Sequence, residues 1–182
     1  PRIVVPTPVA EIVELDGSVD YRLRLFEEAG TYLSPNDAAA NRRLEHYFAG
    51  IASGDIRGEH EIDVLGRPIR ARRSAKGIAW FGFNDICDGP RSQEDYIEIA
   101  RWYPTVIVSD VPALGNSLND QARRFIALVD EFYDRKVKLV LSAETAIDAL
   151  YSGQRLEFEF QRTASRLTEM QTEAYLHAPH LA

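Results

Sequence analysis

Two short apolar runs separated by one amphipathic helix constrain the fold of this chain more than any other feature. Residues 105–109 (TVIVS) and 137–142 (VKLVLS) are almost continuously apolar, which is typical of strands covered on both faces. Residues 118–135 between them place Phe125 and Val129 on one helical face, one turn apart. Strands that alternate with helices pair in parallel. The sequence therefore predicts an α/β fold with a three-layer, open, mainly parallel sheet.

The elements around this unit continue the alternation of strands and helices. IAWFGF (78–83) has the pattern of a buried strand, and residues 92–102 have the pattern of a helix. After the second apolar run we expect a helix at 144–151 and a closing strand-to-helix stretch at 156–175.

A smaller α+β region precedes this sheet. Residues 9–15 (VAEIVEL) alternate apolar and acidic side chains, which is the period of a half-buried strand. Residues 34–37 (SPND) predict a helix start capped by the serine hydroxyl, followed by an apolar stripe of Leu44, Tyr47, Phe48 and Ile51. Residues 60–83 have the pattern of strands joined by a turn. We place the boundary between residues 1–75 and residues 76–182.

Charge and cysteine content argue against several classes of protein. The formal charge of −7 disfavours wholesale binding to nucleic acid, which needs a basic face. Cys87 is the only cysteine, so no intramolecular disulfide can form, which fits a reducing compartment such as the cytoplasm. No apolar stretch approaches the roughly 20 residues of a transmembrane helix. Because the chain starts at Pro1 without a methionine, we expect a processed piece whose missing motifs lie upstream.

One segment is locally basic despite the acidic total. It consists of Arg67, Arg70, Arg72, Arg73 and Lys76, beside the aromatic side chains of Trp80 and Phe81. Such a hairpin could touch nucleic acid or anionic lipid. We favour the alternative, an exposed edge strand that its charges protect from aggregation.

The residues that carry enzyme chemistry are incomplete in this sequence. It contains no G-x-x-x-x-G-K-[ST] loop to hold nucleotide phosphates, and its histidines show no metal-ligand spacing. Asp110 and Glu144 do follow the two apolar runs, where P-loop ATPases place a magnesium-binding acid and a phosphate sensor. We favour the simpler interpretation that Asp110 caps a loop and Glu144 caps a helix.

Several arginines are candidates for contacts with a nucleotide or a neighbouring subunit. Arg22 and Arg24 follow the first predicted strand and could reach a nucleotide phosphate. The alternative for these two is a surface ion pair with Asp20 or Glu27. Arg91 begins a helix, where a cation is unfavourable, so we expect a paired acid such as Asp110 or Asp130, or an anionic ligand.

Two further arginine pairs lie on helices. Arg123 and Arg124 are in the first turns of helix 118–135, where the helix dipole opposes a positive charge. We expect one of them to have a structural role, because adjacent helical residues point about 100° apart. Arg162 and Arg166 should line the polar face of the last helix, with a subunit contact as the alternative.

Long segments of the chain resemble a known family. They are VDYRLR (19–24), YLSP (32–35), GPRSQEDYIEIA (89–100), DQARRFIALVDEFYDRKVKLVLSAE (120–144) and FEFQRTASRLTEMQTEAYL (158–176). These segments resemble the C-terminal half of the ZapE family of AAA+ ATPases, which is linked to bacterial division and is similar to a mitochondrial lactation-elevated ATPase.

The resemblance implies that the site for ATP and Mg²⁺ lies mostly upstream of Pro1, so that no catalytic site is complete in this chain. Residues 9–15 would be the last core strand of the ATPase, and residues 20–75 its helical lid and a connecting hairpin. Residues 76–175 would form a degenerate second P-loop-like domain, in which Asp110 and Glu144 occupy the acid and sensor positions.

The resemblance also implies a function for the parent protein. It suggests a homo-oligomeric ATPase that remodels a protein client, with the division protein FtsZ as a possible client. In this interpretation the upstream ATPase core is the main partner of the chain. The alternative is a non-catalytic docking module that binds a protein whether or not ATP is hydrolysed.

Overall fold

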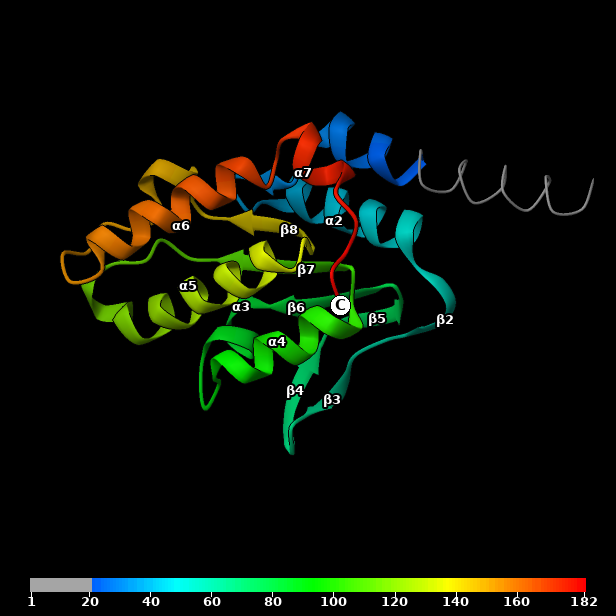
Figure 1. Cartoon of the computed structure of the whole chain (residues 1–182), viewed down its shortest axis with the longest axis horizontal. Coiled ribbons are helices and arrows are strands. Elements are labelled where there is room, and N and C mark those ends of the chain that lie inside the picture. Colours follow the sequence, from blue (N-terminus) through cyan, green and yellow to red (C-terminus); the bar gives the residue numbers. More distant parts are fainter. Residues whose placement is uncertain (1–20) are drawn as a thin grey trace, which may run out of the picture.

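A computed structural model describes residues 21–182, and its central element is one six-stranded sheet (Figure 1). The strands with parallel pairing are β1 (Tyr32–Leu33), β8 (Lys138–Ala143), β7 (Thr105–Val111) and β6 (Ile78–Gly82), in that order. The sheet continues antiparallel through β5 (Arg73–Lys76) to β2 (Ser53–Arg57). The predicted mainly parallel α/β sheet is therefore confirmed, and strands from both sides of residue 75 belong to it.

Helices cover both faces of the sheet. One face packs against α3 (Phe83–Cys87), α4 (Gln93–Trp102), α5 (Asn119–Asp134) and α6 (Glu157–Glu169). The other face packs against a helix at 21–29 and α2 (Ala38–Ile51). The last helix, α7 (Glu173–His177), contributes Tyr175 to the first core and Leu176 to the second. Strand residues alternate between the two cores, since Phe81 and Val108 face the first while Trp80 and Ile107 face the second.

Helix α5 is oriented as its sequence pattern predicts. Phe125 and Val129 are fully buried, and the Phe125 ring lies 6.3 Å from the Phe160 ring and 6.1 Å from the Phe83 ring. Asp134, at the end of the helix, is exposed. The inward face of α5 thus joins α3 and α6 in one core.

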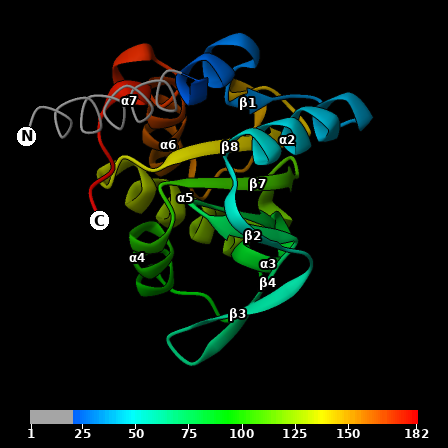
Figure 2. The same cartoon turned by 90° about the vertical axis from the view of Figure 1, so that its right-hand side faces the viewer.

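The predicted hairpin is a separate two-stranded sheet of β3 (His60–Val64) and β4 (Arg67–Ala71), which Figure 2 shows extending away from the main sheet. Leu65 and Gly66 form its turn with φ of 53° and 82°. Two consecutive positive φ angles match the twist of a two-residue hairpin. The backbone N–H of Gly66 donates to Asp63 Oδ1 at 2.8 Å, which fixes the turn.

Local boundaries differ from the prediction at two places. Helix α2 is capped by Asp37, whose carboxylate accepts from the Ala40 N–H at 2.9 Å, rather than by Ser34. Residues 144–151 contain only a short 3-10 helix, Ile147–Ala149. The Leu150 carbonyl accepts from the Leu114 N–H, so the chain there runs beside the loop that contains Leu114 instead of continuing a helix.

The closing segment contains α6 and α7 but no strand, so the strand predicted at its start is wrong. The predicted strand at 9–15 lies outside the described residues. None of the helices in residues 21–182 combines the length and the apolar character that a membrane span requires.

Candidate functional site

The carboxyl ends of β6, β7 and β8 form the edge at which open α/β sheets bind ligands. Gly82 ends β6, Asp110 is the next-to-last residue of β7, and Ser142 is the next-to-last residue of β8. The Asp110 N–H donates to Ser142 Oγ at 2.9 Å. Asp110 has a φ of 62°, a conformation that aspartate tolerates better than most residues with a side chain. Asp110 therefore lies at the carboxyl edge of the sheet, in a backbone conformation that few residue types adopt.

The Asp110 carboxylate is neutralised by an arginine from the chain itself. Arg72, between β4 and β5, donates from Nη2 to Asp110 Oδ2 at 2.7 Å. The amide of Asn36 donates to the other carboxylate oxygen at 3.4 Å. A carboxylate in an ion pair already has the positive charge that Mg²⁺ would otherwise supply. Sequence reasoning noted Arg72 only as part of a basic hairpin, because nothing local links residues 38 positions apart.

The end of β6 has no loop of the kind that wraps phosphates. Gly82 ends the strand and is also the N-cap residue of α3, so the chain passes directly from strand to helix. A Cβ at this position would lie 3.0 Å from Asp85 Oδ2 and 3.3 Å from Arg72 Nη2. The Arg72 guanidinium therefore lies close to the strand end, and a larger residue at position 82 would require Asp85 and Arg72 to shift slightly.

A polar pocket of about 380 Å³ lies beside this edge. Trp80 contributes to its wall, and its charged lining consists of Glu45, Glu59, Arg70, Arg72, Arg73 and Asp85. Most of these cations are already partnered, since Arg70 Nη2 lies 2.6 Å from Glu59 Oε1 and Arg73 lies 4.4 Å from the centre of the Phe48 ring.

Ion pairing extends along the basic hairpin, where Arg67 Nη2 lies 2.6 Å from the buried Asp95 carboxylate. The capping box of α4 uses the same acid, because the Asp95 side chain accepts from the Ser92 N–H. The hairpin is thus an ion-paired structural element rather than a uniform cationic surface.

Glu144 closes a loop at the end of β8. Its Oε2 accepts from the Ala113 N–H at 3.0 Å, and its own N–H donates to the Val111 carbonyl at 2.9 Å. The expected helix cap is therefore replaced by a link between the segments that follow β7 and β8. The carboxylate is used for structure, whereas a phosphate sensor would point toward a ligand.

Arg91 and Arg124 both donate to backbone carbonyls near α3. Arg91 Nε and Nη2 each lie 3.1 Å from the Asp85 carbonyl oxygen, so the acid partners expected for Arg91 are wrong. Arg124 Nη1 lies 3.4 Å from the Cys87 carbonyl oxygen. Arg123 is exposed and makes no hydrogen bond or ion pair within residues 21–182.

The remaining arginines lie on two other surfaces. Arg162 and Arg166 both pair with the carboxylate of Asp130, which ties α6 to α5. Arg22 is exposed on helix 21–29 and lines a groove at the opposite edge of the sheet. Arg24 is exposed on the same helix. The structure therefore does not gather the candidate arginines into one site.

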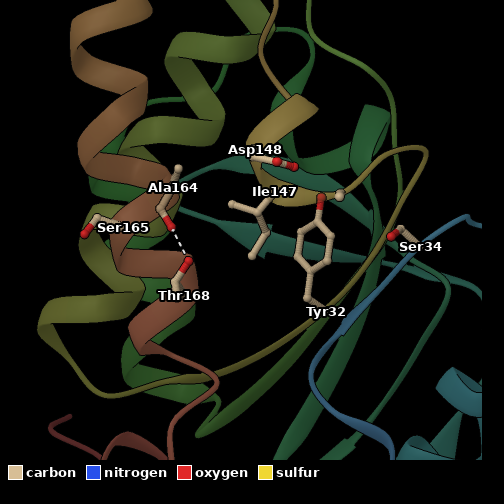
Figure 3. Close-up of a pocket in the computed structure, with 8 residues that line it drawn as sticks. Tyr32, Ser34, Ile147, Asp148, Ala164, Ser165 and Thr168 are labelled. Atoms are coloured by element: carbon tan, nitrogen blue, oxygen red, sulfur yellow. Dashed lines mark hydrogen bonds between the residues drawn. The ribbon is translucent and has the colours of Figure 1, made fainter.

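A second pocket of about 440 Å³ lies between β1, the loop after β8 and α6 (Figure 3). Its polar side chains are Tyr32, Ser34, Asp148, Ser165 and Thr168. The Tyr32 hydroxyl donates to the Thr145 carbonyl at 2.7 Å. Burial and the nearby Asp148 raise the pKa of Tyr32 to about 12. The Thr168 hydroxyl donates to the Ala164 carbonyl within its own helix. The hydroxyls of Tyr32 and Thr168 are therefore engaged by backbone carbonyls.

The chain has an open, mainly parallel sheet with helices on both faces, and an acid and a serine lie at the ends of neighbouring strands. These features define an α/β chain of the P-loop-like class. The model of the AFG1-like ATPase family matches residues 1–179, and the chain belongs to this family.

Curated relatives agree with the family. The chain is 41% identical over 172 residues to the cell division protein ZapE of Escherichia coli K12, covering 94% of this chain and 46% of the relative. It is 33% identical over 210 residues to lactation elevated protein 1 homolog B of Danio rerio, covering 96% of this chain and 42% of the relative. The chain thus spans about half the length of the curated relatives it matches. No solved structure matches the chain at a significant level.

Proposed function

We propose that this chain is the C-terminal part of a ZapE-like AAA+ ATPase that couples ATP hydrolysis to the remodelling of a protein client. The observation that carries the proposal is the family match over residues 1–179, together with 41% identity to ZapE over 94% of the chain. In this proposal the ATP and Mg²⁺ site belongs mainly to the upstream ATPase core, and residues 1–75 supply the end of that core, its lid and a hairpin.

The carboxyl edge supports a coupling role for residues 76–182 rather than a second hydrolytic site. Asp110, at the position of a magnesium-binding acid, is paired with Arg72. Glu144 accepts a hydrogen bond from the Ala113 N–H. These side chains hold strands and loops together instead of facing a nucleotide. In this proposal residues 76–182, with the earlier strands that complete their sheet, transmit the motion of the core.

The relative named as a cell division protein suggests the client and the setting. A homo-oligomeric parent that acts in the cytoplasm on a division protein such as FtsZ fits that name. Arg22 and Arg123, the candidate arginines that make no hydrogen bond or ion pair within residues 21–182, are the candidates for contacts between subunits or with a nucleotide.

The experiment compares the parent protein with this chain. ATP turnover should require the parent and Mg²⁺, FtsZ should alter the turnover, and the chain alone should remain at background. Turnover by the isolated chain at the rate of the parent would refute the placement of the active site upstream.

A measurement of FtsZ binding by the same two proteins separates the alternative function, a docking module. That function is favoured because the acids at the carboxyl edge, Asp110 and Glu144, are already bonded within the chain. In that case the isolated chain should bind FtsZ as tightly as the parent does, with or without ATP.

A further inference from the structure

A groove lies at the amino edge of the sheet, opposite the edge described above. It runs between helix 21–29, the strand starts at Thr105 and Lys138, and the tail at 176–180, and its volume is about 450 Å³. Figures 1 and 2 both show helix 21–29 in blue beside α7 in red. We refer to this space as the amino-edge groove.

The lining of the amino-edge groove combines apolar walls with cationic and imidazole groups. Leu23, Phe26 and Leu176 supply apolar wall, and the cationic and imidazole members are Arg22, Lys138, His177 and His180. Among the described residues that line it, none is an acid, although the whole chain carries a net charge of −7. Glu27 Oε1 and Glu173 Oε1, outside the lining, lie 3.5 and 3.9 Å from His177 Nε2 and offset the charge of that imidazole. The groove therefore attracts an anion through Arg22 and Lys138.

Lys138 holds a positive charge at the buried end of the groove. Its Nζ donates to the carbonyls of Lys136, Tyr175 and Ala178 at 2.9, 3.2 and 2.7 Å. An ammonium has three N–H donors, so all of them are used. Lys138 thus attracts an anion through its charge while fixing the tail that forms one wall.

Arg22 is the lining residue whose donors remain available. Its side chain is exposed at the rim, and within residues 21–182 it has no ion pair. A guanidinium binds a carboxylate with two parallel N–H donors. His180 is less suited, because its Nε2 lies 2.6 Å from the Ala100 carbonyl oxygen.

We propose that the amino-edge groove binds a small amphipathic carboxylate, with its apolar body against Leu23, Phe26 and Leu176 and its carboxylate at Arg22. The volume of the groove lies in the range of sites that enclose small ligands. Apolar walls contribute affinity in proportion to the area they bury, and the cation selects the sign of the head group. The ligand also contacts both the helix at 21–29 and the tail, so its binding stabilises their packing.

The test uses the full 182-residue chain with octanoate, octylammonium and octanamide as probes of equal chain length. Binding is measured by calorimetry and by the shift in melting temperature. Octanoate should bind saturably and raise the melting temperature, whereas octylammonium should not bind. Equal binding of octanoate, octylammonium and octanamide would overturn the proposal, as would no saturable binding of octanoate.

Variants locate the head group. Arg22→Gln should weaken octanoate binding roughly tenfold by removing one charge-assisted contact. Arg162→Gln, which removes an exposed arginine on α6, is the matched control and should leave the affinity unchanged. Octanoate affinity that is equal in both variants and the wild type would refute the role of Arg22. A short peptide with a C-terminal leucine carboxylate that displaces octanoate at far lower concentration would overturn the assignment to a small molecule.

Discussion

Arg72 Nη2 lies 2.7 Å from Asp110 Oδ2, and this pair occupies the edge of the sheet where a magnesium ion would bind in an intact P-loop ATPase. The contact joins the segment between β4 and β5 to the end of β7. The Arg72 guanidinium also lies near Gly82, at the end of the neighbouring strand β6.

This pair should contribute modestly to stability. Both side chains are partly exposed, so we expect Arg72→Gln to lower the free energy of unfolding by about 1 kcal/mol or less. A double-mutant cycle with Asp110→Asn, measured by urea unfolding, isolates the coupling. A coupling energy of zero would show that the two groups do not interact in solution.

Phe125 should be essential to the larger core. Phe125→Ala should cost about 3–5 kcal/mol, because the ring is fully buried between Phe83 and Phe160. Asp134→Ala, on the exposed side of α5, is the control and should change stability little. Similar small losses for both variants in denaturant unfolding would contradict the orientation of the helix.

Arg124 and Arg123 should differ in their effects. Arg124→Ala should lower the melting temperature of the chain, since it removes the hydrogen bond to the Cys87 carbonyl. Arg123→Ala should leave the melting temperature unchanged, because its exposed side chain makes no such contact within the described residues. If Arg123 helps to couple ATP hydrolysis to the protein client, the parent protein with Arg123→Ala should lose turnover or client binding. Two variants that match the wild type in both melting and turnover would refute both roles.

The Cys87 thiol should be unreactive in the folded chain. Burial raises the pKa of this thiol well above its usual range, so little of the reactive thiolate is present at neutral pH. Iodoacetamide should label Cys87 slowly in buffer and rapidly in concentrated urea, as followed by mass spectrometry. Fast labelling without urea would mean that α3 opens readily.

Lys138 should make stability depend on pH. Burial lowers the pKa of its ammonium to about 8 in the folded chain, compared with the usual value of 10.5. Between these two values the unfolded chain binds more protons at this lysine, so Lys138 should make the free energy of unfolding rise as pH increases from 8 toward 9. Above pH 9 the raised pKa of the buried Cys87 thiol acts in the opposite direction. Lys138→Met should flatten this rise, while Lys76→Met, on the exposed end of β5, should keep it. Equal slopes for the wild type and Lys138→Met from pH 8 to 9 would contradict the lowered pKa.

Local patterns were sufficient for part of this structure. The apolar runs of β7 and β8 and the stripe of α5 identify the parallel sheet, because a strand or helix must bury one specific set of side chains. The same reasoning failed for residues 144–151, where the Leu150 carbonyl accepts from the Leu114 N–H instead of continuing a helix. It also placed the cap of α2 at Ser34, three residues before Asp37.

The sequence by itself determined the class of fold, the absence of a phosphate-binding loop motif and the inward face of α5, since each depends on residues close together along the chain. Only the tertiary structure decided that Arg72 pairs with Asp110 and that Lys138 binds the carbonyls of the tail. Those partners are separated by tens of residues, and arginine or lysine can pair with many acids and carbonyls. Which one it meets is set by the path of the backbone and the register of the strands, which no local pattern encodes.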